Sequence, residues 1–180
     1  MSGVALLSSP ALANEGEEQP TDIVVTAIPQ AYQGDFDASE IPQSIAVLDE
    51  QLLQQNAVLR LTDALDLNAS VSRQNNFGGL WDSFAVRGFA GDENLPSGYL
   101  VNGFNAGRGF GGPRDVAGVE RIEILRGPSA ALFGRGEPGG TVNITTKQAD
   151  FTKSFGTASV LAGSFDRYRG DADLNLALGD

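Results

Sequence analysis

The side chains that most often carry catalysis or bind metals are absent from this sequence or poorly placed for it. Its 180 residues include no histidine and no cysteine. Disulfides are therefore excluded, as is any zinc or haem site that draws on those residues within the chain. A carboxylate pair for acid–base catalysis could be sought in Glu120 and Glu123. They stand three apart in a predicted strand, which puts them on opposite faces, so we expect no catalytic pair.

Two segments have the composition of binding loops. Residues 74–82 carry Phe77 and Trp81, and residues 103–113 carry Arg108 and Phe110 among glycines at 107, 109, 111 and 112. Both segments are too long and too rich in glycine to be simple turns. Glycine lets backbone N–H groups approach a ligand closely, and loops between regular elements often carry function. The pattern therefore favours binding.

The elements that would position these loops are short. Residues 44–48 suit a strand, and Asp49 can cap a helix over residues 50–56. Thr62 can cap a second helix over residues 63–67. Further strands are predicted at residues 70–73, 83–87, 99–101, 119–125 and 141–146. We therefore expect an α/β (α+β) domain with a small mixed sheet and short helices.

The composition and the net charge of the chain limit the classes of molecule that it can bind. Hydrophobic residues make up 41% of the chain and charged residues 19%, as in a globular protein, and 23 glycines indicate many tight turns. With 23 acidic and 12 basic residues the net charge is −11. Because that charge repels phosphate backbones, we expect no nucleic-acid partner.

The C-terminal residues change character. Along residues 168–178 one face carries Tyr168, Leu174 and Leu176, while the other carries Arg169, Asp171 and Asp173. This alternation is typical of a transmembrane β-strand with a lipid face and a polar lumen face. Residues 156–163 form a weaker partner strand. A soluble sheet with one wet face gives the same alternation.

The N-terminal region has two readable segments. Residues 1–13 end in an Ala-x-Ala site after a short apolar stretch, as a signal-peptide remnant does, although a floppy apolar terminus fits as well. Residues 14–40 are polar and predicted to be flexible. Within them lies a β-branched hexapeptide that suits a strand awaiting a partner sheet, or an edge strand of the domain itself: Asp22, Ile23, Val24, Val25, Thr26 and Ala27.

An ordered series of motifs resembles the TonB-dependent outer-membrane receptors, in particular their siderophore branch. The hexapeptide at 22–27 resembles a TonB box, and residues 41–48 resemble the opening strand of the plug. Val86-Arg87-Gly88-Phe89 and residues 119–128, which end in Leu125-Arg126-Gly127-Pro128, resemble two further plug strands. Asn102-Gly103 stands where the family usually has an Asp-Gly or Asn-Gly turn, and residues 132–134 and 138–144 complete the series. Each motif is weak by itself, and the ordered set is specific.

The resemblance implies an architecture and an outer-membrane location. Residues 1–13 would be the signal-peptide remnant, 14–40 the flexible segment with the TonB box, 41–150 the plug domain, and 151–180 the first strands of a truncated transmembrane β-barrel. A barrel of about 22 strands needs roughly 220 residues in strands alone. Because few residues follow Lys153, we expect this chain to be a fragment of a longer receptor.

The resemblance also implies partners and site residues. TonB would bind the box by strand addition, and a ferric siderophore would meet Phe77, Trp81, Arg108 and Phe110. Trp81 packed on the barrel wall and a solvated Arg108 are the structural alternatives. Arg87 and Arg126 would lock the plug to glutamates of the wall. No cofactor and no catalysis are implied.

Two other functions stay open at this point. The first is a receptor of the same family for another solute, such as cobalamin, haem or an oligosaccharide. The second is a soluble periplasmic binding module without a membrane role. The sequence downstream of residue 180 would distinguish them.

Overall fold

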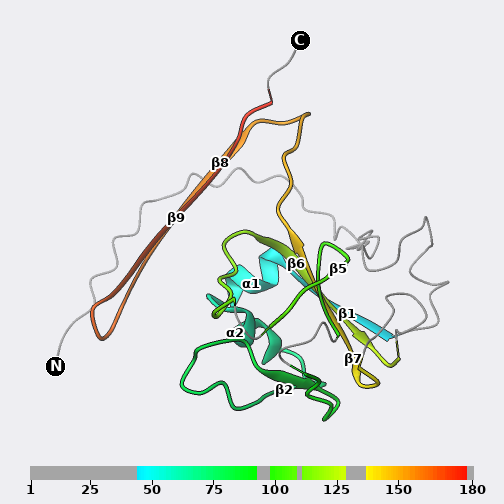
Figure 1. Ribbon diagram of the computed structural model, residues 1–180. Helices are drawn as coiled ribbons and strands as arrows, with labels where there is room; N and C mark the ends of the chain where they lie inside the picture. Colours follow the sequence, from blue (N-terminus) through cyan, green and yellow to red (C-terminus); the bar gives the residue numbers. More distant parts are fainter. Residues whose placement is uncertain (1–43, 93–97, 109–110, 129–136, 178–180) are drawn as a thin grey trace, which may run out of the picture.

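The computed structural model describes residues 44–92, 98–108, 111–128 and 137–177 (Figure 1). The predicted signal remnant, the box at 22–27 and Phe110 lie outside the described residues. The described elements, in chain order, are β1 (Ser44–Asp49), α1 (Glu50–Gln55), α2 (Leu61–Leu65), β2 (Val71–Arg73), β3 (Phe84–Val86), β4 (Tyr99–Val101), β5 (Phe104–Asn105), β6 (Val119–Arg126), β7 (Gly140–Thr146), β8 (Phe155–Gly163) and β9 (Arg167–Asn175).

The first helix begins where the sequence predicts. The Asp49 side chain accepts a hydrogen bond from the Leu52 N–H at 2.8 Å, which satisfies one of the free donors of the first turn. Asp49 is also the last residue of β1, so strand and helix join without a loop. The predicted cap is confirmed.

The second helix begins earlier than predicted. Its N-cap is Arg60, which makes no side-chain cap bond, and Thr62 lies buried inside the helix. The Leu61 N–H instead donates to the Arg114 carbonyl at 2.9 Å. A backbone carbonyl distant in the sequence therefore accepts a hydrogen bond at the start of the helix, where the sequence predicted a threonine side chain as the cap.

A five-stranded mixed sheet forms the centre of the globular domain, defined here as residues 44–150. Its order is β1-β6-β7-β4-β5, with β4 and β7 parallel and the other neighbours antiparallel. The predicted fold class is confirmed.

The strand β5 was not predicted from the sequence. It pairs with β4 across a two-residue turn where Asn102 and Gly103 have φ of 52° and 81°. Positive φ at both positions is the geometry that Asn-Gly favours in hairpins.

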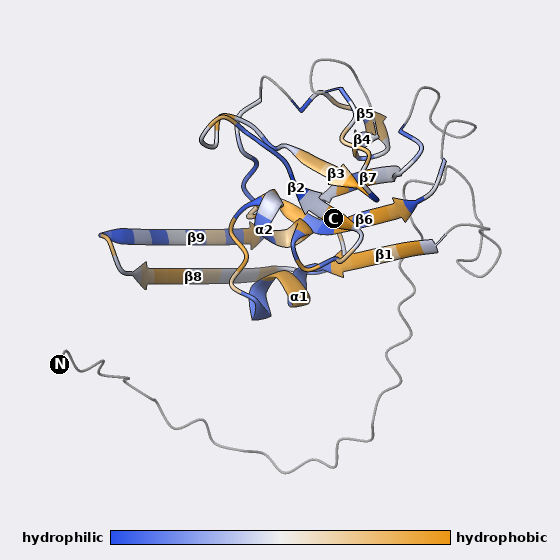
Figure 2. Cartoon of the chain, turned by 90° about the horizontal axis from the view of Figure 1, so that it is seen from below, coloured by the Kyte–Doolittle hydropathy of each residue, from blue (hydrophilic) through white to orange (hydrophobic). Residues whose placement is uncertain are grey.

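The two faces of this sheet differ in chemistry. One packs against α1, α2 and the small β2–β3 sheet to form the apolar core, which includes Leu61, Leu65, Ile122, Ile124 and Ile144. The other carries buried polar side chains, among them Glu123 of β6, which pairs with Asn143 of β7, and Thr141, which pairs with the apolar Leu125. Figure 2 shows the apolar character of β1 and β6.

The strands β8 and β9 form a long antiparallel hairpin that extends from the globular domain (Figure 1). Its register pairs Ala158 with Ala172 and Gly156 with Leu174 on one face, and Ser159 with Asp171 on the other. Tyr168, Leu174 and Leu176 are exposed, as the predicted alternation requires. Within the described ranges, no helix is long and apolar enough to cross a membrane.

Candidate functional site

The first predicted binding loop presents an aromatic pair at the surface. Phe77 is 67% exposed, and its ring centroid lies 5.3 Å from that of Trp81 at an interplanar angle of 43°. The loop is shaped by two asparagines: Asn75 Oδ1 accepts from the Phe77 N–H at 3.0 Å, and Asn76 Oδ1 accepts from the Gly79 N–H at 3.1 Å. These local bonds hold Phe77 in a left-handed conformation with φ of 49°. The structure therefore brings Phe77 and Trp81 together.

Arg108 lies elsewhere than the sequence suggested. Its side chain is buried, with Nη1 donating to the Phe84 carbonyl at 2.8 Å and Nη2 to the Ala90 carbonyl at 2.5 Å. The guanidinium carbon also sits 4.4 Å from the centroid of the Phe84 ring. Arg108 thus braces β3 and the residues after it. The structure thus places this side chain inside the plug, with two of its nitrogens bonded to backbone carbonyls, and not at an open loop surface.

A buried carboxyl anchors the end of the aromatic loop. Asp82 follows Trp81 directly, and its Oδ2 accepts from the Arg114 N–H at 2.8 Å. Burial raises the pKa of Asp82 above its usual value, and the bond from Arg114 partly offsets that rise. In the sequence, Asp82 is only the last residue of the loop at 74–82. Nothing in its local pattern shows that its partner lies more than thirty residues away.

The two predicted lock arginines converge on one residue. The Arg87 N–H donates to the Ser70 carbonyl at 2.7 Å, while Arg126 Nε donates to Ser70 Oγ at 3.3 Å and Arg126 Nη1 to Ser44 Oγ at 2.9 Å. Among the described residues, no carboxylate forms an ion pair with either arginine. The Arg126 guanidinium is therefore bonded to two serine hydroxyls, and Arg87 is held next to it through its backbone N–H.

Glycines explain how these strand ends come so close. A Cβ on Gly139 would lie 2.0 Å from the Val86 carbonyl oxygen, and one on Gly140 would lie 2.3 Å from the Leu125 carbonyl oxygen. Both neighbours are backbone atoms that cannot rotate away. The Gly139-Gly140 pair thus allows β7 to begin between the ends of β3 and β6, next to the residues that precede Arg87 and Arg126.

The structure corrects the expected placement of Glu120 and Glu123. A β-bulge between Val119 and Arg121 breaks the simple alternation of β6. Both carboxylates consequently reach Arg121: its Nη1 lies 3.0 Å from Glu120 Oε1, and its Nε lies 2.9 Å from Glu123 Oε1. Asn143 Nδ2 donates to Glu123 Oε2 at 2.9 Å. This cluster is a structural ion-pair network, with both carboxylates held by one guanidinium.

Comparison with known proteins identifies the family. The family model described as the TonB-dependent Receptor Plug Domain matches residues 37–141, more than half of the chain. The chain belongs to the TonB-dependent receptors.

Curated relatives of this TonB-dependent receptor chain carry metallophore names. It is 40% identical to the metal-pseudopaline receptor CntO of Pseudomonas aeruginosa, over 98% of this chain and 27% of that protein. It is 25% identical to the catecholate siderophore receptor Fiu of Escherichia coli K12, over 94% of this chain and 23% of that protein. The chain thus spans about a quarter of the length of these relatives.

Solved structures agree with this assignment. The open form of the ferric-catecholate import receptor Fiu from E. coli K12 matches with a TM-score of 0.66 and 28% identity, over 79% of this chain and 20% of that one. The siderophore receptor PiuA of Acinetobacter baumannii matches with a TM-score of 0.67 and 27% identity, over 77% and 19%. The globular domain is the plug domain of a TonB-dependent receptor, antiparallel strands follow it, and the protein is located in the outer membrane.

Proposed function

We propose that the whole protein is an outer-membrane receptor that takes up a metal–siderophore chelate, specifically a ferric siderophore, with energy supplied through TonB. The observation that carries the proposal is the contact of the exposed Phe77 ring with the half-buried Trp81 ring, displayed by a loop of a plug domain whose family match spans residues 37–141. Exposed aromatic rings suit the organic body of a chelate. The names of the similar receptors, which refer to siderophores or to metal-pseudopaline, support the same ligand class.

Ligand contact is assigned to Phe77 and Trp81, with Phe110 as a further candidate from the glycine-rich loop. Arg108 is left out of this group because its guanidinium donates to two backbone carbonyls of the plug. Because the side chain is buried and two of its nitrogens are bonded within the plug, it is poorly placed to meet an anionic ligand.

The hairpin β8–β9 is assigned to the barrel wall, with Tyr168 and Leu174 toward lipid and Arg169 and Asp171 toward the plug. Its alternation and its exposed apolar face support this role. Arg87 and Arg126 are proposed to bind glutamates of the wall beyond residue 180. Their position at one end of the sheet, next to Ser70, makes a joint acidic partner possible.

The TonB box is assigned to Asp22, Ile23, Val24, Val25, Thr26 and Ala27, which would add to a sheet of TonB through main-chain hydrogen bonds. In the full-length receptor, Val24→Pro removes a backbone donor and should abolish uptake of ferric siderophore while binding to cells persists. Val24→Ala keeps the N–H group and is the matched control. Normal uptake by the proline variant would refute this assignment.

A second ligand is favoured by a specific observation, the 40% identity to a metal-pseudopaline receptor. Uptake of radiolabelled metal, presented either as a ferric siderophore or as the pseudopaline complex, separates the two. Transport of the pseudopaline complex with no transport of any ferric siderophore would replace the first ligand by the second.

A further inference from the structure

Two cationic side chains lie between the plug domain and the hairpin. Each forms ion pairs with one carboxylate of the plug domain and one carboxylate of the hairpin. Arg169 of β9 binds Asp115 of the plug through both terminal nitrogens, with Nη2 2.7 Å from Oδ1, and it also pairs with Asp171 of its own strand at 2.8 Å. Lys147, just after β7, has its Nζ 2.8 Å from Glu50 Oε1 of α1 and 2.8 Å from Asp173 Oδ2 of β9. We call these two groups the hairpin clamp.

The plug side of the clamp is rigidly mounted. The Arg114 carbonyl accepts from the Leu61 N–H at 2.9 Å, and the Val116 N–H donates to the Leu59 carbonyl at 3.2 Å. The Arg114 N–H donates to the buried Asp82. The segment that carries Asp115 is thereby bonded to the start of α2 and to the end of the aromatic loop, which fixes the backbone on both sides of this residue.

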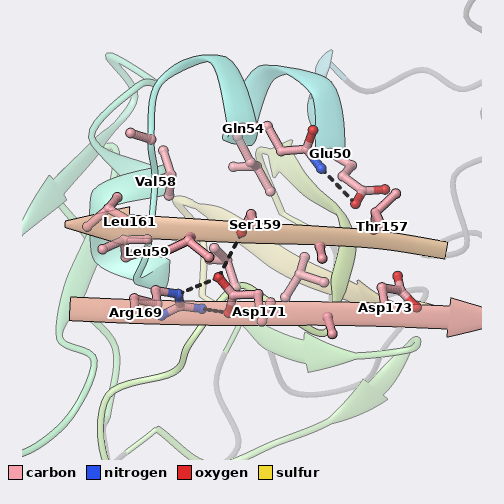
Figure 3. A pocket seen from close by; sticks show the side chains of 18 of the residues that line it. Glu50, Gln54, Val58, Leu59, Thr157, Ser159, Leu161, Arg169, Asp171 and Asp173 are labelled. Atoms are coloured by element: carbon pink, nitrogen blue, oxygen red, sulfur yellow. Dashed lines mark hydrogen bonds and ion pairs between the residues drawn. The ribbon is translucent and has the colours of Figure 1, made fainter. Parts of the chain in front are cut away.

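The hairpin side of the clamp follows from strand periodicity. Arg169, Asp171 and Asp173 occupy alternate positions and share the face opposite to Tyr168 and Leu174. Figure 3 shows Arg169 and Asp171 projecting from β9 beside Ser159 of β8, with Glu50 on the helix above. They border a cleft of about 430 Å³ between α1 and the hairpin. Arg169 and Lys147 are half-buried, with side-chain exposures of 21% and 25%, whereas their partners Asp115 and Glu50 are 53% and 42% exposed, so water screens both pairs in part.

The clamp stands at the opposite end of the plug sheet from the lock arginines. Register pairs Ser44 with Arg126 at one end of β1 and β6, and Asp49 with Arg121 near the other. Val119, at the clamp end, pairs with Thr146, the residue before Lys147. Seven residue steps of about 3.3 Å from Val119 to Arg126 separate the two ends by roughly 20 Å.

We propose that the hairpin clamp is a second fastening of the plug to the barrel wall, with Asp115 as its key plug residue and Arg169 as its key wall residue. Here the plug supplies the acid and the wall supplies the arginine, whereas at the other end Arg87 and Arg126 are plug cations. Opposite polarity at the two ends specifies one orientation of the plug, because a reversed plug would place Arg169 against Arg87 and Arg126. The inference rests on the proposed role of the hairpin as barrel wall.

A charge swap in the full-length receptor tests the clamp. Asp115→Arg and Arg169→Asp, each alone, should speed amide hydrogen exchange in residues 59–62 and 114–118 by roughly two- to fivefold, and the double variant should restore the slower rate. Asp66→Arg is the matched control, since Asp66 pairs with Arg73 within the plug at 2.6 Å. It should leave the exchange of residues 114–118 unchanged.

Failure of the double variant to restore exchange, or an equal effect of the Asp66 control, would overturn the proposal. If the Asp115→Arg variant does not assemble in the outer membrane, the Asp115→Asn variant is measured in its place. Unchanged hydrogen exchange in the Asp115→Asn variant would also overturn the proposal. Uptake of ferric siderophore by the unmodified receptor is measured separately. If the unmodified receptor takes up no ferric siderophore but the double variant restores slow exchange, the proposed function is refuted and the clamp stands. If uptake is normal but the double variant does not restore slow exchange, the clamp is refuted and the proposed function stands.

Discussion

Burial should decide the strength of the two ion pairs that share Arg121. Glu123 and Glu120 approach this guanidinium at nearly equal distances, 2.9 and 3.0 Å, but the Glu123 side chain is 0% exposed and that of Glu120 is 42% exposed. Replacing each by glutamine removes the charge with little change in volume. The pair of variants therefore compares the same interaction in two environments.

The expected magnitudes differ severalfold. Removing one partner of a buried ion pair typically costs about 3–5 kcal/mol, because the other charge is left without compensation. In the Glu123→Gln variant, Arg121 still pairs with Glu120 and is slightly exposed to water. The loss of folding free energy should therefore lie near the lower limit of this range, at about 3 kcal/mol. It also places an amide against the Asn143 donor. Glu120→Gln loses an exposed pair and should cost less than about 1 kcal/mol.

Hydrogen exchange of β6 and β7 in the full-length receptor measures this difference, since those amides exchange when the sheet opens. At 1.4 kcal/mol for each factor of ten, Glu123→Gln should speed exchange by about a hundredfold and Glu120→Gln by less than about sixfold. Equal acceleration by the two variants would refute the reasoning, because proximity to Arg121 rather than burial would then set the energy.

Three further changes test other parts of the structure. Gly139→Ala should destabilise the plug by several kcal/mol, about 3 or more, because the new methyl would meet the Val86 carbonyl at 2.0 Å; a plug melting temperature equal to that of the unmodified receptor would contradict this. Trp81→Ala should weaken ligand binding by about 1–3 kcal/mol if the ring is a buried anchor in the complex, as titration of the solubilised receptor would show; unchanged affinity would make Trp81 structural. Arg126→Ala should loosen the plug in the full-length receptor by stranding a wall carboxylate, at a cost of about 3–5 kcal/mol, and raise channel leak; unaltered leak and unaltered exchange of the plug sheet would argue against the lock.

Features that depend on neighbouring residues were predictable from the sequence. Asp49 caps α1 because its side chain reaches an N–H three residues away. Asn102-Gly103 turns the chain because these two residue types tolerate positive φ. The alternation of residues 167–175 sets which face of the hairpin is apolar, since a strand repeats every two residues.

Features that depend on distant partners were decided by the tertiary structure. Helix α2 begins earlier than predicted because the Arg114 carbonyl, more than fifty residues away, accepts a hydrogen bond from the Leu61 N–H. Arg108 became an internal brace because β3 supplies carbonyl acceptors and an aromatic ring. No sequence pattern near Asp115 indicates Arg169, fifty-four residues away.

The bulge in β6 shows the limit most clearly. Sequence periodicity placed Glu120 and Glu123 on opposite faces, as an unbroken strand requires. Pairing with β7 inserts an extra residue at Glu120, and both carboxylates then reach Arg121. Local residue types determine what each segment can form, whereas the register against a partner strand determines which side chains meet, because that register is set by packing across the whole sheet.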